Sequence, residues 1–386
     1  MSLGESLARG VDRFGHPISG SRATLIRVNR IDDHHARVTV VDSVGMVAVP
    51  RMQLVVKPKI PQGHLLHLVE IAGVLPRLAP RPTSIREDEN LAQLIARWFV
   101  TALERVLEEG LSRGYRERTG ELKSVRGRVS PLHSARLFYR GRLAVFSEYE
   151  AFDFDTPLNR LLLGAAKVVA AGVPFPEKTR RRAIRAIKRM DEVGEFCPGD
   201  LSARAERTTA HYADAATLAR EVIESSGRSL SAGLGRGWGF LFRTAKPVEI
   251  GIRNILRESF ADELAVTKKQ FRFGGSKMNA SPDLVFGDVL AVGDVKYKLG
   301  GDSWSRPDLY EVVAFAAAAE REHAVLANFR PLGSPALLPV QVGRIEITEV
   351  SWPADVELDP HEAAGIFAER VGSWVGRLRP TSLTPG

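Results

Sequence analysis

The chain has 386 residues, of which 44% are hydrophobic and 26% are charged. These fractions are typical of folded soluble proteins and exclude a chain dominated by disorder. At about 150 residues per domain, the length predicts two or three domains. Lys and Arg number 54 against 46 Asp and Glu, and the resulting net charge of +8 is compatible with an acidic partner such as nucleic acid.

Cysteine content and apolar patterning bear on the cellular compartment. The single Cys197 excludes an intramolecular disulfide and a cysteine-based zinc cluster. The first residues do not form a basic-then-apolar signal peptide, and no run approaches the roughly 18 apolar residues that a transmembrane helix needs. We therefore expect a cytoplasmic protein without membrane association.

The elements predict an α+β multidomain fold with three parts. Residues 1–60 contain short β-favouring runs separated by turn residues, which indicates a β-rich N-terminal module. Such a pattern is equally compatible with a plain β-barrel or sandwich and with a partner-docking module. Residues 61–235 form a mostly helical middle domain, and glycines between 233 and 239 predict a flexible junction. Residues 236–386 form the third domain.

The helices of the middle domain are predicted from apolar residues at helical spacing. Gly110 is the expected end of one helix, and Asp155 or Thr156 is the expected N-cap of another that has Pro157 in its first turn. The helical ranges are His64–Val74, Glu87–Leu111, 157–169, Thr179–Arg189 and about Ala210–Ser226.

Two basic segments of the middle domain are candidate DNA contacts. Arg126 and Arg128 flank a glycine in one, and Arg181 and Arg185 lie on the basic face of the helix at 179–189. Arginines of this kind bind phosphates. A solvated charged loop and a solvated helix face are the alternatives.

The third domain contains a stretch with acids and lysines at regular spacing. Two apolar runs flank Gly287-Asp288, which predicts two antiparallel strands joined by a turn within residues 281–298. Such a hairpin brings Asp283 close to Asp294. Because side chains alternate along a strand, Asp294, Lys296 and Lys298 share one face.

These residue types suit phosphodiester hydrolysis. Two carboxylates can hold Mg²⁺, or Mn²⁺ in its place, while leaving coordination positions for water and phosphate. A lysine can then hold or polarise the attacking water. The alternative is a surface ion pair between Asp294 and Lys296, with Asp283 as a turn former only. Burying a charged acid between apolar residues of a central strand costs folding free energy. Such a residue is therefore expected to have a function, which favours the catalytic interpretation.

The order of elements and the motif resemble a known nuclease superfamily. A helix from Pro247 that carries Glu249 is followed by a strand at 268–273, the hairpin, a helix at 307–321 and a strand at 324–329. With Pro282-Asp283 and Asp294-Val295-Lys296, this resembles the PD-(D/E)xK nucleases. The third domain is accordingly expected to be an α/β nuclease domain with a mixed sheet.

Further segments resemble the McrC family, the nuclease subunits of modification-dependent (5-methylcytosine) restriction systems. The resemblance covers about residues 40–330. It rests on five segments: Lys57–Ile60, Gly110–Tyr115, Val125–Arg128, Phe154–Arg160 and Asp294–Lys298. The resemblance implies that Asp283 and Asp294 bind Mg²⁺, that Lys296 assists the attacking water and that Glu249 is an auxiliary ligand. Lys298 is expected among the DNA contacts.

The resemblance also implies partners. The substrate would be methylated or otherwise modified DNA, and the motor would be an McrB-like AAA+ GTPase hexamer that the N-terminal module enters and stimulates. Two rival functions remain at this point: a non-catalytic adaptor that binds DNA and activates a motor, and a stand-alone DNA nuclease. One departure is Tyr310-Glu311, where related nucleases often have Tyr-Gln, so that an acid occupies the place of an amide.

Overall fold

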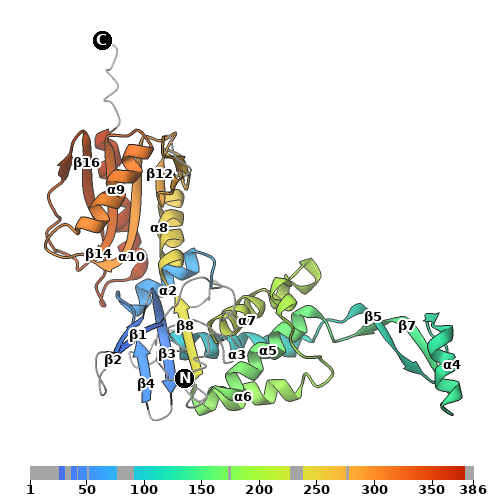
Figure 1. Cartoon of the computed structure of the whole chain (residues 1–386). Helices are drawn as coiled ribbons and strands as arrows, with labels where there is room; N and C mark the ends of the chain where they lie inside the picture. The colour runs from blue at the N-terminus through green and yellow to red at the C-terminus, as the bar shows by residue number, and fades with distance from the viewer. Residues whose placement is uncertain are drawn as a thin grey trace.

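The computed structural model describes residues 26–30, 36–40, 42–49, 52–75, 91–172, 175–226, 238–274 and 278–378. Figure 1 shows two bodies and a projecting arm: a C-terminal sheet domain, an N-terminal and helical body beneath it, and a ribbon that extends far from both. Among the described residues, none of the helices combines the length and the apolar character that a membrane crossing requires.

The N-terminal module consists of short antiparallel strands, as its alternating sequence predicts. The strands β1 (Ile26–Arg30) and β2 (Ala36–Val40) form one ribbon. The strands β3 (Ser43–Val49) and β4 (Met52–Val56) pair with each other, and β3 also pairs with β8 (Trp238–Arg243). The predicted boundaries at residues 60 and 235 therefore do not isolate this sheet, because β8 reaches it from beyond the helical region.

The helical body buries the apolar stripes that the sequence shows. It contains α3 (Leu91–Glu109), α5 (Pro157–Ala171), α6 (Glu177–Lys188) and α7 (Ala213–Ser226). Gly110 ends α3 with a positive φ of 104°, and the Thr156 hydroxyl accepts the Asn159 N–H as the N-cap of α5. Both of these predictions are confirmed, whereas the expected helix start before Leu91 lies outside the described residues.

The arm was not foreseen, since the middle region was predicted to be mostly helical. Its strands β5 (Gly114–Leu122) and β7 (Val145–Asp153) pair along their whole length, with β6 (Arg128–Val129) beside β7 and α4 (Pro131–Tyr139) at the far end. Side chains on both faces of β5 are largely exposed. A strand that covers no core, as β5 does, lacks the apolar alternation by which strands are found in a sequence.

The C-terminal domain is built on a mixed six-stranded sheet with the order β15-β16-β14-β13-β12-β9. Its strands are β9 (Val266–Thr267), β12 (Leu284–Phe286), β13 (Ala291–Leu299), β14 (His323–Arg330), β15 (Val340–Val342) and β16 (Ile345–Pro353). The helices are α8 (Ala245–Ser259), α9 (Arg306–Ala318) and α10 (Pro360–Leu378). A small separate ribbon pairs β10 (Phe271–Arg272) with β11 (Asn279–Ala280).

Two hydrophobic cores cover the two faces of this sheet. Val285, Val292 and Leu326 pack with α9 on one face. Phe286 and Val295 belong to the larger core on the other face, which includes residues of α8 and α10. The register confirms the predicted hairpin, since Leu284 pairs with Gly293 and Phe286 with Ala291 across a turn that contains Gly287 at φ 56°. The α+β class and the mixed sheet are thus as predicted.

A short helix joins the two bodies. The helix α2 (Gln62–Ile71) contacts α8 and α10. Its buried His64 accepts the indole N–H of Trp352 in β16 at 2.8 Å, and the other ring nitrogen lies 2.8 Å from the carbonyl oxygen of Asp355. Burial lowers the pKa of His64, although the carbonyls act in the opposite direction. A neutral imidazole therefore connects the bodies.

Candidate catalytic site

The predicted acids meet where β12 and β13 pair. Asp283 lies one residue before Leu284, so the antiparallel register places it opposite Asp294, one residue beyond Gly293. Asp294 lies two residues after Val292, and Asp283 lies two residues before Val285, so each acid is on the same face of the sheet as that valine. Both valines pack toward α9. The side chains of Asp283 and Asp294 are only 9% and 4% exposed. Two buried carboxylates consequently lie side by side on one face of the sheet.

Lys296 shares that face and binds two acids. Its Nζ lies 2.7 Å from Oδ2 of Asp294 and donates to Oε2 of Glu311 on α9 at 2.6 Å. Burial alone would lower the pKa of Lys296, but the contacts with these carboxylates outweigh it and raise the pKa. The structure thus shows Glu311 facing the site from its helix, where it holds the lysine.

Glu249 of α8 reaches the same cluster from the other side of Asp283. Burial raises the pKa of Glu249 to about 7, and the negative charge of Asp283 adds to the shift. Burial likewise raises the pKa of Asp294 to about 7 despite the opposing effect of Lys296, with Asp283 and Glu311 contributing repulsion. Both shifts arise chiefly from burial, and repulsion among the carboxylates adds to them.

One further residue of the cluster was missed in the sequence. Lys268 follows β9, and its Nζ donates to Oδ1 of Asp283 at 2.8 Å and lies 3.9 Å from Oε2 of Glu249. The position depends on β9 pairing with β12 through Val285–Thr267 and Phe286–Val266. The predicted strand at 268–273 began at this lysine, and therefore gave no reason to bring it to the acids.

The residues predicted to contact DNA are spread over the molecule. Lys298 lies beside the cluster, where its Nζ binds the carboxylate of Asp308 on α9. Arg126 and Arg128 lie on the arm, which projects away from the C-terminal sheet. Arg181 and Arg185 are exposed on α6, and Arg181 forms an ion pair with Glu177 at 2.7 Å. The fold thus brings only Lys298 to the acids.

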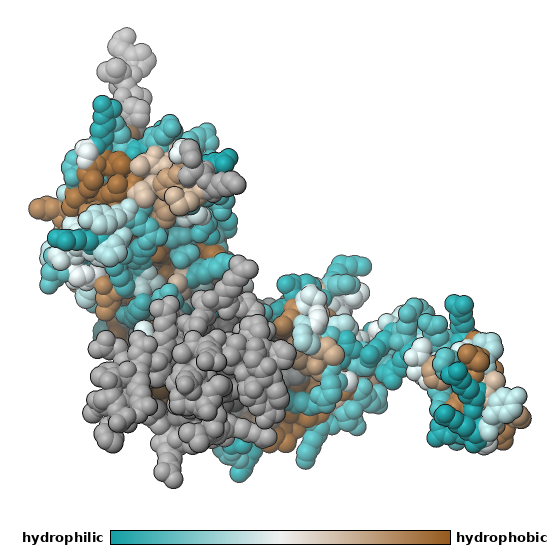
Figure 2. Space-filling view, viewed as in Figure 1, coloured by the Kyte–Doolittle hydropathy of each residue, from teal (hydrophilic) through white to brown (hydrophobic). Residues whose placement is uncertain are grey.

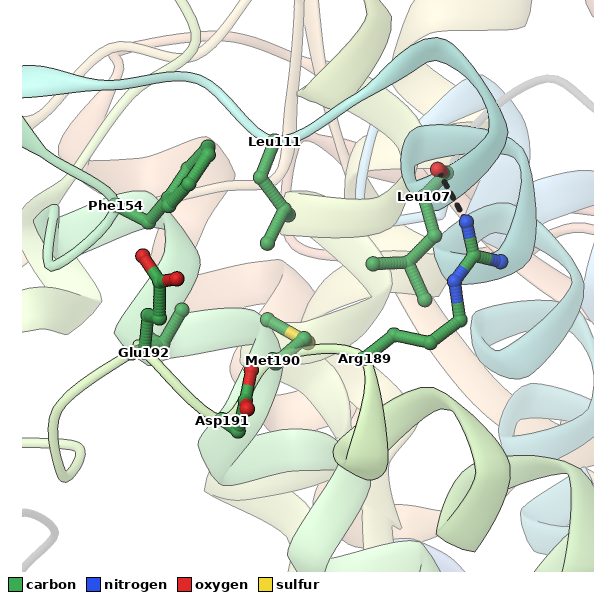
Figure 3. Close-up of a pocket in the computed structure, with 8 residues that line it drawn as sticks. Leu107, Leu111, Phe154, Arg189, Met190, Asp191 and Glu192 are labelled. Carbon is green, nitrogen blue, oxygen red and sulfur yellow. Dashed lines mark hydrogen bonds between the residues drawn. The ribbon is translucent and has the colours of Figure 1, made fainter.

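A hollow of about 200 Å³ lies apart from the cluster, between the end of α3, the start of α5 and the loop after α6. Figure 3 shows Leu107, Leu111 and Phe154 along one side and the acids Asp191 and Glu192 along the other. The guanidinium of Arg189 donates to the Leu107 carbonyl at 2.7 Å and so satisfies the last turn of α3. This hollow contains no lysine–carboxylate pair like those of the cluster.

The carboxylates fit a divalent cation in donor chemistry. Oδ2 of Asp294 is buried and has no hydrogen-bond donor, because Lys296 approaches it closely but outside hydrogen-bond geometry. Buried anionic oxygens without donors are sites that a hard cation satisfies. Within the described ranges, no three His, Cys, Asp or Glu side chains are arranged as a complete metal site. Mg²⁺ usually keeps several waters and needs one or two carboxylates, so this arrangement is compatible with it.

These features define an α+β protein with a cluster of acids and lysines at the centre of a mixed sheet. The sequence profile of a family described as McrBC 5-methylcytosine restriction system component matches residues 38–327. Since the match extends over more than half of the chain, the protein belongs to this family.

One solved structure shares the fold over most of the chain. The chain is similar to one in the half-complex of a tetradecameric assembly of Thermococcus gammatolerans McrB AAA+ hexamers with bound McrC, with a TM-score of 0.62 and 15% identity over 90% of this chain and 85% of that one. A chain of the Thermococcus gammatolerans McrBC complex matches with a TM-score of 0.42 and 17% identity, over 63% of this chain and 74% of that one. None of the curated protein sequences compared matches the chain.

Proposed function

We propose that the chain is the Mg²⁺-dependent DNA endonuclease subunit of an McrBC-like, modification-dependent restriction complex and that its C-terminal domain is of the PD-(D/E)xK type. The observation that carries the proposal is the shared face of Asp283, Asp294 and Lys296 at the β12–β13 pair. Membership in a family described as a 5-methylcytosine restriction system component supports DNA that carries a modified base as the substrate class.

Each residue of the cluster has a separate task in this mechanism. Asp283 and Asp294 would hold the cation, with Glu249 as an auxiliary ligand through a bound water or directly. When bound, such an ion would supply positive charge to neutralise the scissile phosphate and would activate water as the nucleophile. Lys296 stays beside the site through Glu311, 2.6 Å away, and orients the attacking water toward phosphorus. Lys298, which forms an ion pair with Asp308, would bind a neighbouring phosphate.

A motor partner is part of the proposal. The similar chain comes from an assembly of McrB AAA+ hexamers with bound McrC. For the present chain we propose a related AAA+ GTPase, whose GTP hydrolysis the chain stimulates. The N-terminal module remains one proposed docking element.

The arm is a second candidate docking surface. Its far end exposes Leu132, Phe138, Tyr139 and Leu143 by 63%, 68%, 88% and 86%. Figure 2 shows the apolar patches there among hydrophilic residues. An exposed cluster of this kind on a projecting ribbon is typical of a protein–protein contact.

The experiment is cleavage of methylated DNA by the chain assembled with its GTPase, in the presence of GTP and Mg²⁺. We expect Asp294→Ala and Lys296→Ala to reduce cleavage at least 100-fold, because each removes a group that acts on the transition state. Stimulated GTP hydrolysis should persist, since neither residue lies on the arm or in the N-terminal module. Asp302→Ala, at an exposed position after β13, is the matched control.

The outcomes separate the rival functions. Cleavage that survives both substitutions rules out this site. GTPase stimulation without any cleavage by the wild-type complex indicates an adaptor, and cleavage by the purified chain without GTPase indicates a stand-alone nuclease.

A further inference from the structure

Four acids and two lysines of the C-terminal domain form one charge cluster that is divided into two halves. Lys296 forms ion pairs with Asp294 and Glu311, and Lys268 forms ion pairs with Asp283 and Glu249. With every group ionised, four negative charges face two positive charges. Acids thus outnumber ammonium groups among these six side chains, and opposite charges at these distances interact strongly where water is partly excluded.

The two lysines differ in how firmly they are held. The Lys296 side chain is 21% exposed and retains Glu311 as a partner when Asp294 is engaged elsewhere. Lys268 is 39% exposed and follows a two-residue strand at the edge of the sheet. Within the described ranges, its ion-pair partners are the acids Asp283 and Glu249.

A metal ion and the Lys268 ammonium compete for the same oxygens. The ammonium lies 2.8 Å from Oδ1 of Asp283, whereas a bound Mg²⁺ lies about 2.1 Å from its oxygen ligands. Two positive charges at such separations repel each other, so the Asp283 carboxylate can hold either the ammonium, which it shares with Glu249, or the cation, which it would share with Asp294. The exposed, flexible lysine is the group that can leave.

We infer that Lys268 is a built-in counter-ion of the metal site, which neutralises Asp283 and Glu249 in the absence of the divalent cation and turns outward to a DNA phosphate when that cation binds Asp283. The inference rests on the proposed function. It adds a positioning residue that keeps two buried acids together before metal loading and then contributes to substrate binding. A lysine stem of four methylene groups allows this movement without a change in the backbone.

The test measures binding of Mn²⁺ alone to the purified full chain by titration calorimetry or electron paramagnetic resonance. Lys268→Met retains the apolar stem and removes the charge, so we expect Mn²⁺ to bind about tenfold more tightly. Lys268→Arg retains the charge and should bind Mn²⁺ with wild-type affinity or more weakly. The adjacent exposed Lys269→Met is the matched control and should equal the wild type.

Cleavage by the assembled complex gives a second readout with the opposite sign. At saturating Mg²⁺, Lys268→Met should raise the KM for DNA by about tenfold, because the phosphate contact is lost, while less Mg²⁺ is needed for half-maximal rate. A purely structural role would weaken metal binding and cleavage together.

Asp294→Ala, measured in parallel, separates the counter-ion role of Lys268 from the existence of the metal site. If Asp294→Ala abolishes Mn²⁺ binding but Lys268→Met leaves it unchanged or weakens it, the counter-ion role is wrong and the metal site stands. If the wild type binds no Mn²⁺, or Asp294→Ala binds it equally well, the metal site and the counter-ion role both fail.

Discussion

The anchor of the arm gives a prediction that can be worked out from contacts. Asp155 lies where β7 ends and α5 begins, and its side chain is 8% exposed. Its Oδ1 accepts the Gly194 N–H at 3.0 Å and lies 3.2 Å from Nη1 of Arg160, while Arg116 of β5 binds Oδ2. We expect Asp155→Asn, which retains the shape and removes the charge, to loosen the base of the arm.

The magnitude follows from the burial of the partners. Removing one member of a fully buried ion pair costs about 3–5 kcal/mol. Arg116 is 46% exposed, and Arg160 keeps Asp200 as a partner at 2.8 Å, so solvent and the second acid compensate part of the loss. We therefore expect about 2–3 kcal/mol of local destabilisation. At about 1.4 kcal/mol per factor of ten, amide exchange should accelerate about 30- to 150-fold.

The assay is hydrogen–deuterium exchange of peptides that cover the start of α5 and the loop around Gly194. Asp191→Asn, at an exposed position of the same loop, is the control and should leave exchange unchanged. Acceleration below about threefold in Asp155→Asn would show that Asp155 does not anchor the arm. Equal acceleration throughout the C-terminal domain would indicate general destabilisation instead.

Two other predictions concern the connection between the bodies and the tip of the arm. The pKa of His64 is lower in the folded protein than in the unfolded chain, so the unfolded chain binds the extra proton at a higher pH. The free energy that neutral His64 contributes to folding is therefore fully present above the unfolded pKa of about 6.5, and it decreases as the pH falls from that value through the folded pKa. His64→Phe should remove this pH dependence in thermal unfolding scans between pH 7 and 5, and an unchanged slope would contradict the assignment. At the tip, Phe138→Ser with Tyr139→Ser should reduce stimulation of the partner's GTP hydrolysis at least tenfold, since both side chains are mostly exposed and contribute little to the fold. Undiminished stimulation, with far-ultraviolet circular dichroism as the folding control, would exclude the tip as a docking surface.

Local patterns in the sequence predicted the centre of the C-terminal domain. Gly287-Asp288 between apolar runs specified the turn, and the alternation of side chains placed Asp294 and Lys296 on one face. Both inferences use neighbours within about fifteen residues, where turn chemistry and strand parity determine geometry. The metal-binding and catalytic roles of these residues remain predictions.

Contacts between distant segments were beyond reach of the same patterns. Lys268 meets Asp283 only because β9 pairs with β12, and His64 meets Trp352 across 288 positions of the chain. The arm was missed for a different reason, because its strand β5 covers no core and its polar sequence carries no apolar alternation. The structure explains one residue of the segments that indicated the family. Gly127 has a φ of 66°, and a Cβ atom there would lie 2.2 Å from the Glu148 carbonyl oxygen, so only glycine fits this position.

The segment that follows β4 shows how the N-terminal part is connected to the cluster. The backbone N–H of Lys59 donates to the Tyr297 hydroxyl at 3.1 Å, and Tyr297 lies between Lys296 and Lys298 in β13 with its side chain on the opposite face. Nearby, α2 and α8 meet at backbone distance, because a Cβ on Gly251 would lie 2.4 Å from the Leu68 carbonyl oxygen.

Residues 57–71 therefore contact both elements that carry the acids, the strand of Asp294 and the helix of Glu249. Close-packed interiors do not deform gradually, so a displacement of α2 must either move α8 and β13 with it or break these contacts. A displacement of residues 57–71 would consequently reach the acids through two paths, the Lys59–Tyr297 hydrogen bond to β13 and the contact of α2 with α8.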